Sequence, residues 1–208
     1  MAESYQEESK IKPLLDLLNH CRDMLLAVLE IDDEQPPKIV FHIDEEKRKR
    51  CKGYYCHATN TISINADIVR EGFNELTRTF REKGGDFRDK MRGPKMSELI
   101  NVLSHELKHR QQNLSNDNEF ISDFEIESKL DLNNDEDYRK YSLLNSEIDA
   151  RAFSRIGLAI VLKDWESFWK VDNDNDLNNS QYDFYLIKNI VMYKDYIPDD
   201  IFKKIMEK

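Results

Sequence analysis

The segment HELKH contains two histidines and a glutamate at a spacing that suits metal chemistry. His105 and His109 stand four residues apart, so on a helix both imidazoles lie on one face and can reach the same ion. Zinc accepts imidazole nitrogens, and a catalytic zinc takes three protein ligands and a water. Glu106 follows the first histidine and is long enough to take a proton from that water. The pattern predicts a Zn²⁺ site with Glu106 as general base.

The residues around this motif strengthen the interpretation. By chance, H-E-x-x-H would occur in roughly one in a hundred chains of this length and composition. The apolar residues on the same predicted helix indicate that the helix is buried; they are Leu99, Ile100, Val102, Leu103 and Leu107. Buried histidines need polar partners. The competing interpretation is therefore structural: two core histidines that hydrogen-bond to backbone groups or carboxylates.

A third ligand is expected from a later helix, residues 141–160. Glu147 and Asp149 both lie on it, but residues two apart on a helix point about 200° from each other. A stripe of small residues on the Glu147 side indicates close packing there. The stripe consists of Ser146, Ala150 and Ser154. We favour Glu147 as the ligand and keep Asp149 as the alternative ligand. If Glu147 binds the metal, Asp149 is expected to orient a ligand imidazole, which is a common role for a carboxylate beside a zinc site.

These two segments resemble the gluzincin group of zincin metallopeptidases. HELKH matches the HExxH motif of that group, and Glu147 opens the sequence EIDA, which matches its E-x-x-A pattern. The order of elements is similar to that of small members, including ImmA/IrrE-like and phage-associated peptidases, in which H-E-x-x-H-x-x-Q recurs, here ending at Gln112. The resemblance covers residues 38–163. Arg151 departs from it, since many relatives carry an aspartate there.

The resemblance implies a zinc-dependent metallopeptidase, in which His105, His109 and Glu147 bind the metal. Glu106 would pass the proton of the water to the leaving amine. In zincins an edge strand lies just above the metal, so an extended substrate is expected to add to the free edge of the hairpin at residues 53–64. An oxyanion also needs a hydrogen-bond donor. The nearby candidates, none of them distinguished, are Tyr138, Tyr141, Arg110 and Arg151.

Two other functions fit the same residues. One is a binding or inhibitor module, such as a mobile-element or regulatory protein, that retains a zincin scaffold without catalysis. The other is a hydrolase that uses the same zinc and water on a substrate that is not a peptide. The substitution Glu106→Gln separates catalysis from binding, because only catalysis needs the carboxylate.

Patterns along the chain predict an α+β fold of one zincin-like domain over residues 1–208, in which a small antiparallel or mixed sheet packs against the HExxH helix and the ligand helix. Apolar residues at helical spacing predict an N-terminal helix over 11–30, with Pro13 in its first turn. β-Branched and aromatic residues predict strands. The strands are expected at 38–43, 54–57 and 61–64.

Helices are expected to follow the hairpin. One is capped by Asn65 or Asp67 and runs to about Glu82. Gly93-Pro94 precedes the HExxH helix, which is expected to have Ser97 as its cap and to run to about Asn113. The polar residues 115–140 predict a loop with one short helix. The ligand helix is expected at 142–163. A C-terminal helical extension over 164–208 should contain helices at 164–170 and 181–207, the second broken near Pro198.

Composition narrows the expected partners and compartment. The net charge of −10 over 208 residues disfavours nucleic acid, and we interpret the basic run 47–50 as a solvated turn. The acidic segment 172–183 only partly matches a calcium-binding loop, and we interpret it as a linker.

No apolar run approaches the roughly 20 residues of a membrane span, and the acidic N-terminus does not resemble a signal peptide. Three cysteines suit a reducing compartment. We expect a cytoplasmic protein that acts on a protein or peptide, in an oligomeric state that the sequence leaves open.

Overall fold

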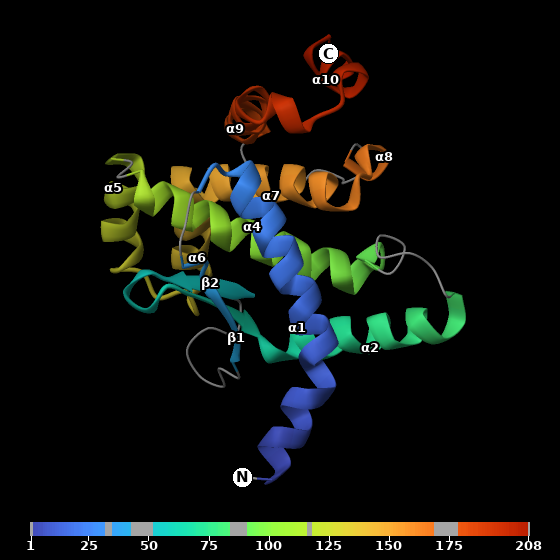
Figure 1. The fold of residues 1–208 in the computed structure, drawn as a ribbon. Helices are drawn as coiled ribbons and strands as arrows, with labels where there is room; N and C mark the ends of the chain where they lie inside the picture. The colour runs from blue at the N-terminus through green and yellow to red at the C-terminus, as the bar shows by residue number, and fades with distance from the viewer. Residues whose placement is uncertain are drawn as a thin grey trace.

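The computed structural model describes residues 2–31, 35–42, 52–83, 91–115, 118–168 and 179–207. These residues form an α+β fold, mostly helical, with one small mixed sheet (Figure 1). In that view the sheet lies beneath the helices α4 (Pro94–Leu114) and α7 (Asn145–Leu162), which run side by side across the middle of the molecule. The predicted α+β class with a small mixed sheet is confirmed.

The sheet has three strands in the order β1-β3-β2. They are β1 (Lys38–His42), β2 (Gly53–Cys56) and β3 (Thr61–Asn65). The central strand β3 runs parallel to β1 and antiparallel to β2, so β2 is an edge strand. A short 3-10 helix, His57–Thr59, and Asn60 in the left-handed conformation (φ 47°) join β2 to β3. The predicted hairpin is confirmed, except that His57 lies in the turn.

The core is built where α1 (Ala2–Val28) crosses α4 and α7 (Figure 1). The apolar side of α1 is buried there, including Leu14, Leu18, Cys21 and Leu25. Gly157 of α7 allows the close approach, because a Cβ at this position would lie 2.8 Å from Ser104 Oγ and 3.0 Å from Leu25 Cδ2. The three helices therefore hold the HExxH segment in a packed layer.

The N-terminal helix begins earlier than the apolar pattern predicts. It starts at Ala2 and not at residue 11, so Pro13 lies inside the helix instead of in its first turn. The preceding residues, AESYQEESK, are mostly good or neutral helix formers, and they extend the helix without an apolar repeat. The proline removes one backbone hydrogen bond but does not end the helix.

Between α4 and α7 the prediction of a loop with one short helix is wrong. The chain forms two helices, α5 (Asn118–Glu127) and α6 (Asp135–Ser142). Asn134 caps α6 by accepting hydrogen bonds from the backbone N–H groups of Glu136 and Asp137. Asp123 of α5 accepts a 2.8 Å hydrogen bond from the backbone N–H of Ser146. This contact fixes α5 against the first turn of α7, the helix that carries Glu147.

The C-terminal helices follow the prediction more closely. They are α8 (Trp165–Phe168), α9 (Asn179–Met192), the 3-10 helix Lys194–Tyr196 and α10 (Asp199–Met206), with Pro198 at the N-cap of α10. α9 packs on α7. The basic run at 47–50 and the acidic stretch from residue 172 to 178 lie outside the described residues. No helix of the described part combines the length and the apolar character that a membrane crossing requires.

Candidate metal centre

The helix that carries HELKH is capped from outside its own sequence. Glu75, in α2 (Ala66–Lys83), accepts hydrogen bonds from the backbone N–H groups of Lys95 and Met96 at 2.8 and 2.9 Å. A carboxylate at a helix N-terminus also interacts favourably with the helix dipole. The helix begins at Pro94, and the predicted cap at Ser97 is wrong, because the backbone N–H of Ser97 already donates to Gly93 within the first turn.

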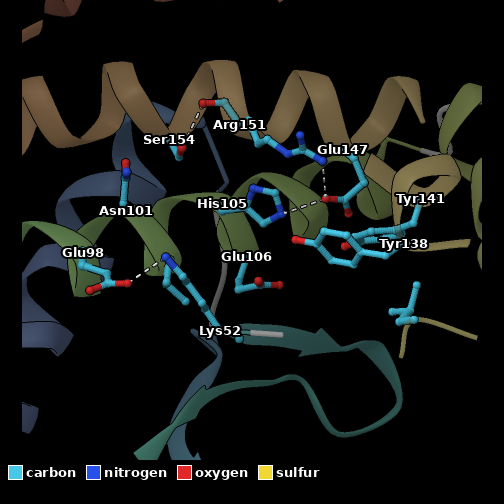
Figure 2. Close-up of a pocket in the computed structure, with 13 residues that line it drawn as sticks. Lys52, Glu98, Asn101, His105, Glu106, Tyr138, Tyr141, Glu147, Arg151 and Ser154 are labelled. Carbon is cyan, nitrogen blue, oxygen red and sulfur yellow. Dashed lines mark hydrogen bonds and ion pairs between the residues drawn. The ribbon is translucent and has the colours of Figure 1, made fainter. Parts of the chain in front are cut away.

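Three ligand atoms converge between α4 and α7, and Figure 2 shows two of the residues, His105 and Glu147, side by side. His105 Nε2 lies 3.3 Å from Glu147 Oε2, and His109 Nε2 lies 2.9 Å from Glu147 Oε1. The two Nε2 atoms are 2.9 Å apart, and the rings are nearly perpendicular, at 85°. The structure thus brings together the three residues that the sequence suggested as metal ligands.

These three groups fit a zinc ion. Ligand atoms bonded to tetrahedral zinc at about 2.0–2.1 Å lie about 3.3 Å from one another. The observed separations of 2.9 to 3.3 Å are close to this spacing, with each histidine measured to a different oxygen of Glu147, and one ligand atom from each residue lies within 4.8 Å of the others. The lone pairs of two imidazoles and a carboxylate that face each other repel unless a proton or a cation lies between them. Two nitrogens and one oxygen are also a donor set that zinc prefers.

Asp149, the alternative ligand, faces away from the two imidazoles. Its Oδ2 accepts a 3.0 Å hydrogen bond from Gln112 Nε2 and lies 3.4 Å from Lys108 Nζ. Its Oδ1 accepts a 2.7 Å hydrogen bond from Asn189 Nδ2 of α9. Asp149 is therefore part of a buried polar network behind the three ligand atoms.

Gln112 connects this network to the candidate metal ligand His109. The amide N–H₂ of Gln112 donates to Asp149 and to the backbone carbonyl of Ser146, so its Oε1 must face His109 Nδ1, 2.9 Å away. His109 consequently carries a proton on Nδ1 and directs Nε2 towards Glu147 and His105, where Nε2 presents a lone pair once it has lost its own proton. Asp149 thus orients an imidazole through Gln112, and not by direct contact as the sequence suggested. The sequence feature that could have predicted this hydrogen bond is the spacing of His109 and Gln112, which stand three residues apart on one helix.

The local charges couple the ligands to one another. Burial opposes protonation of His109, but the Glu147 carboxylate outweighs it and raises the pKa of His109 to about 9. Burial also favours a neutral Glu147, yet His109 and His105 hold its pKa well below the usual value. For Glu106, burial dominates and raises the pKa, although both histidines act in the opposite direction. A carboxylate with a raised pKa is the stronger proton acceptor that general base catalysis needs.

A pocket of about 310 Å³ opens beside His105, Glu106 and Glu147 (Figure 2). The edge strand β2 forms one wall through Gly53, and its neighbour Lys52 also lines the pocket. A Cβ at Gly53 would lie 2.6 Å from Val102 Cγ1, so glycine lets the strand cross closely over the turn of α4 that carries Glu106. The pocket is therefore bordered by a candidate metal site, by the carboxylate of Glu106, which is the candidate general base, and by strand β2.

Of the four candidate oxyanion donors, three line this pocket. They are Tyr138, Tyr141 and Arg151. Arg110 lies elsewhere, because its Nε donates to Asn60 Oδ1 of the hairpin turn at 3.1 Å. Burial raises the pKa of Tyr141 well above its usual value, and a hydrogen bond to Glu147 adds to the shift. The Tyr141 hydroxyl therefore stays protonated and can act as a donor.

Comparisons with known proteins do not extend this description. No family model matches the sequence, and searches of curated proteins and of solved structures found no similar protein. The functional interpretation therefore depends on the residues of the site and on their geometry.

Proposed function

We propose that this protein is a zinc-dependent metallopeptidase with a zincin-type active site. The single observation that supports the proposal is the convergence of His105, His109 and Glu147 beside a pocket that also contains Glu106. The edge strand β2 on the same pocket favours an extended peptide as the substrate. We further propose that the protein acts in the cytoplasm, which the sparse cysteines favour.

The residues of the pocket have separate roles in this mechanism. A zinc ion held by the three ligands would supply a Lewis acid that polarises the scissile carbonyl and lowers the pKa of water to about 7. Glu106 takes a proton from the attacking water and passes it to the leaving amine. Tyr141, whose single O–H donates to Glu147 in this structure, can donate to the developing oxyanion only after it leaves that carboxylate.

The substrate backbone would extend the sheet. Within the described residues β3 is the strand that pairs with β2. The proposed substrate would add at the outer edge of β2, where the Tyr55 backbone hydrogen-bonds to Glu106, as in other cases of strand addition. Because β2 crosses α4 next to Glu106, a peptide on that edge has a scissile bond near the general base. This arrangement favours an extended, unfolded segment over a folded protein surface.

Metal analysis provides the first test. Protein purified without metal and then supplied with zinc should hold one zinc per chain, and His109→Ala should lose it. A wild-type protein that takes up no stoichiometric zinc would contradict the proposal.

Glu106→Gln tests catalysis separately from folding and metal binding. We expect this variant to retain zinc and to lose peptide cleavage by about 10²–10⁴-fold, since it removes the proton carrier. Cells that express the wild type, Glu106→Gln or the exposed α6 variant Glu136→Gln can be compared for new protein termini. New termini should appear with the wild type and with Glu136→Gln only. If the biological effect persists in Glu106→Gln, the binding-module alternative is correct instead.

A further inference from the structure

Arg151 is one of two cations that line the pocket and have no role in the proposed mechanism. It lies on α7 one helical turn after Glu147, and its side chain, which is 26% exposed, points into the pocket (Figure 2). Its Nη2 donates a 2.9 Å hydrogen bond to the carbonyl of Ser142 and lies 3.9 Å from Glu147 Oε2. Within the described part of the chain, the guanidinium has no other polar contact. A guanidinium has five N–H donors, so most of its hydrogen-bonding capacity faces the pocket.

The Glu147 carboxylate does not form a hydrogen bond with the Arg151 guanidinium. The 3.9 Å separation from Glu147 is too long for a hydrogen bond, whereas both histidines approach the same carboxylate more closely. With a divalent ion among the three ligands, the charge of Glu147 is neutralised locally. Arg151 then lies beside a positively charged centre without a counter-ion, and an anion in the pocket would be favourable at this position.

The other cation of the pocket is already paired. Lys52 Nζ lies 2.7 Å from Glu98 Oε1, and the Lys52 side chain is 62% exposed to solvent. Figure 2 shows this ion pair at the opposite end of the pocket from Arg151. A negatively charged substrate group would therefore bind at Arg151 and not at Lys52.

We propose that Arg151 binds a carboxylate of the substrate, so that the preferred peptides carry an acidic group next to the scissile bond. This inference rests on the proposed peptidase function. A guanidinium can bind a carboxylate through two parallel hydrogen bonds, and a lysine cannot reproduce that geometry. The carboxylate can come from an Asp or Glu side chain or from the C-terminus of a peptide. Both sources present the same group, and the experiment distinguishes them.

The test uses pairs of quenched fluorescent peptides that differ only in charge. One series replaces Glu by Gln at each position around the scissile bond, and the other replaces the free C-terminal acid by the amide. The zinc-loaded wild type should cleave the carboxylate member of one series at least 10-fold faster, which identifies the source. Arg151→Met should slow the carboxylate members by about 10–100-fold more than the uncharged members. Arg139→Met, which removes an exposed positive charge from α6, should leave the preference intact.

A binding measurement separates this inference from the proposed function. The same peptide pairs are titrated by fluorescence anisotropy into zinc-loaded Glu106→Gln, which should bind without cleaving and prefer the carboxylate member by about 10-fold. The double variant Glu106→Gln, Arg151→Met should bind the carboxylate peptide and its uncharged partner with equal affinity. If Arg151→Met loses zinc or does not fold, Arg151→Lys replaces it and should retain only part of the preference.

The inference is overturned if the wild type cleaves the carboxylate peptide and its uncharged partner equally fast, or if Glu106→Gln binds the two peptides equally well. It is also overturned if Glu106→Gln binds neither peptide. Slowing of all peptides to the same extent by Arg151→Met also overturns it, because that result indicates an oxyanion donor. If the wild type holds zinc and cleaves no peptide, the peptidase proposal fails, and the binding preference alone decides the role of Arg151.

Discussion

The amide of Gln112 fixes which nitrogen of His109 faces the other ligands. Loss of an outer partner of a zinc ligand typically lowers metal affinity by 10–100-fold. We predict that Gln112→Met, which keeps the size of the side chain but removes the acceptor, weakens zinc binding by that factor in a competition titration with a chelator.

The neighbouring residue provides a matched control for this change. Gln111 contacts Lys108, Tyr193 and the carbonyl of Leu29, but none of the candidate ligands. Gln111→Met should therefore lower stability without changing the zinc dissociation constant. Equal zinc affinity in the two variants would show that the hydrogen bond from His109 to Gln112 has no role in the site.

The buried pair of His109 and Glu147 makes the stability of the metal-free protein depend on pH. The folded pKa of His109, about 9, lies above the unfolded value of 6.5, so its contribution is complete below pH 6.5 and is lost as the pH rises through 9. The pKa of Glu147 is depressed, so its contribution is present above 4.5 and is lost at lower pH. We expect the free energy of unfolding to fall by at most about 3 kcal/mol between pH 6.5 and 9.

Thermal unfolding of chelator-treated protein across this range measures the effect. His109→Gln removes the titrating group and should abolish the decline above pH 6.5. A decline of the same size in both proteins would assign the pH dependence to other groups.

The sequence indicates the site residues because their spacing is local. His105, Glu106 and His109 lie within two turns of one helix, so periodicity alone places the imidazoles on one face. The choice of Glu147 over Asp149 used the packing stripe of α7, and in the structure Glu147 faces the rings. Neither the buried Lys108 nor Asn189 could be predicted, since each is brought to Asp149 by the packing of distant helices.

Among the elements, α2 and α4 are joined by a cap that no pattern within α4 reveals. Glu75 is buried and accepts two backbone hydrogen bonds at the start of α4, and losing such a cap typically costs about 1–2 kcal/mol. We predict that Glu75→Ala lowers the free energy of unfolding by this amount, measured by urea denaturation. The two candidate histidine ligands lie further along α4, and Glu147 lies on α7, so zinc stoichiometry should be unchanged.

Glu71 of the same helix provides the control. It forms an exposed ion pair with Lys95 Nζ and makes no backbone contact of this kind. Surface ion pairs contribute about 0–1 kcal/mol, so Glu71→Ala should have little effect. Comparable losses in the two variants would mean that the cap does not stabilise α4.

Hydrophobic periodicity in the sequence locates the main helices and strands, but it does not predict elements that are stabilised mainly by tertiary contacts. α5 and α6 are short and polar, and they are held by Asn134 and by the contact between Asp123 and Ser146, so composition alone suggested a loop. The strand sequences likewise did not predict that β1 would pair in parallel with β3, because pairing direction depends on the connection between strands.

For the molecule as a whole, the chemical reactivity of the Cys21 thiol measures whether the hydrophobic core opens. Its thiol is fully buried in α1, and burial raises its pKa to about 12, so it is protonated and inaccessible at neutral pH. We predict that iodoacetamide at pH 8 modifies the half-buried Cys56 while Cys21 stays unmodified until the protein unfolds. Peptide mass spectrometry measures each site separately. Early modification of Cys21 would show that α1 separates from α4 and α7 in the native state.

The hydrogen bond from Asn189 to Asp149 bears on how small a working fragment of this chain can be. The sequence motifs HELKH and EIDA end at residue 150, but α9 provides one of the groups that hold Asp149 in place. Tyr193, just beyond that helix, contacts Lys108 and Gln111. A shortened protein that keeps HELKH and EIDA but stops before α9 would expose the Asp149–Gln112 chain to water. We expect such a fragment to retain every ligand and still bind zinc more weakly than the full-length protein.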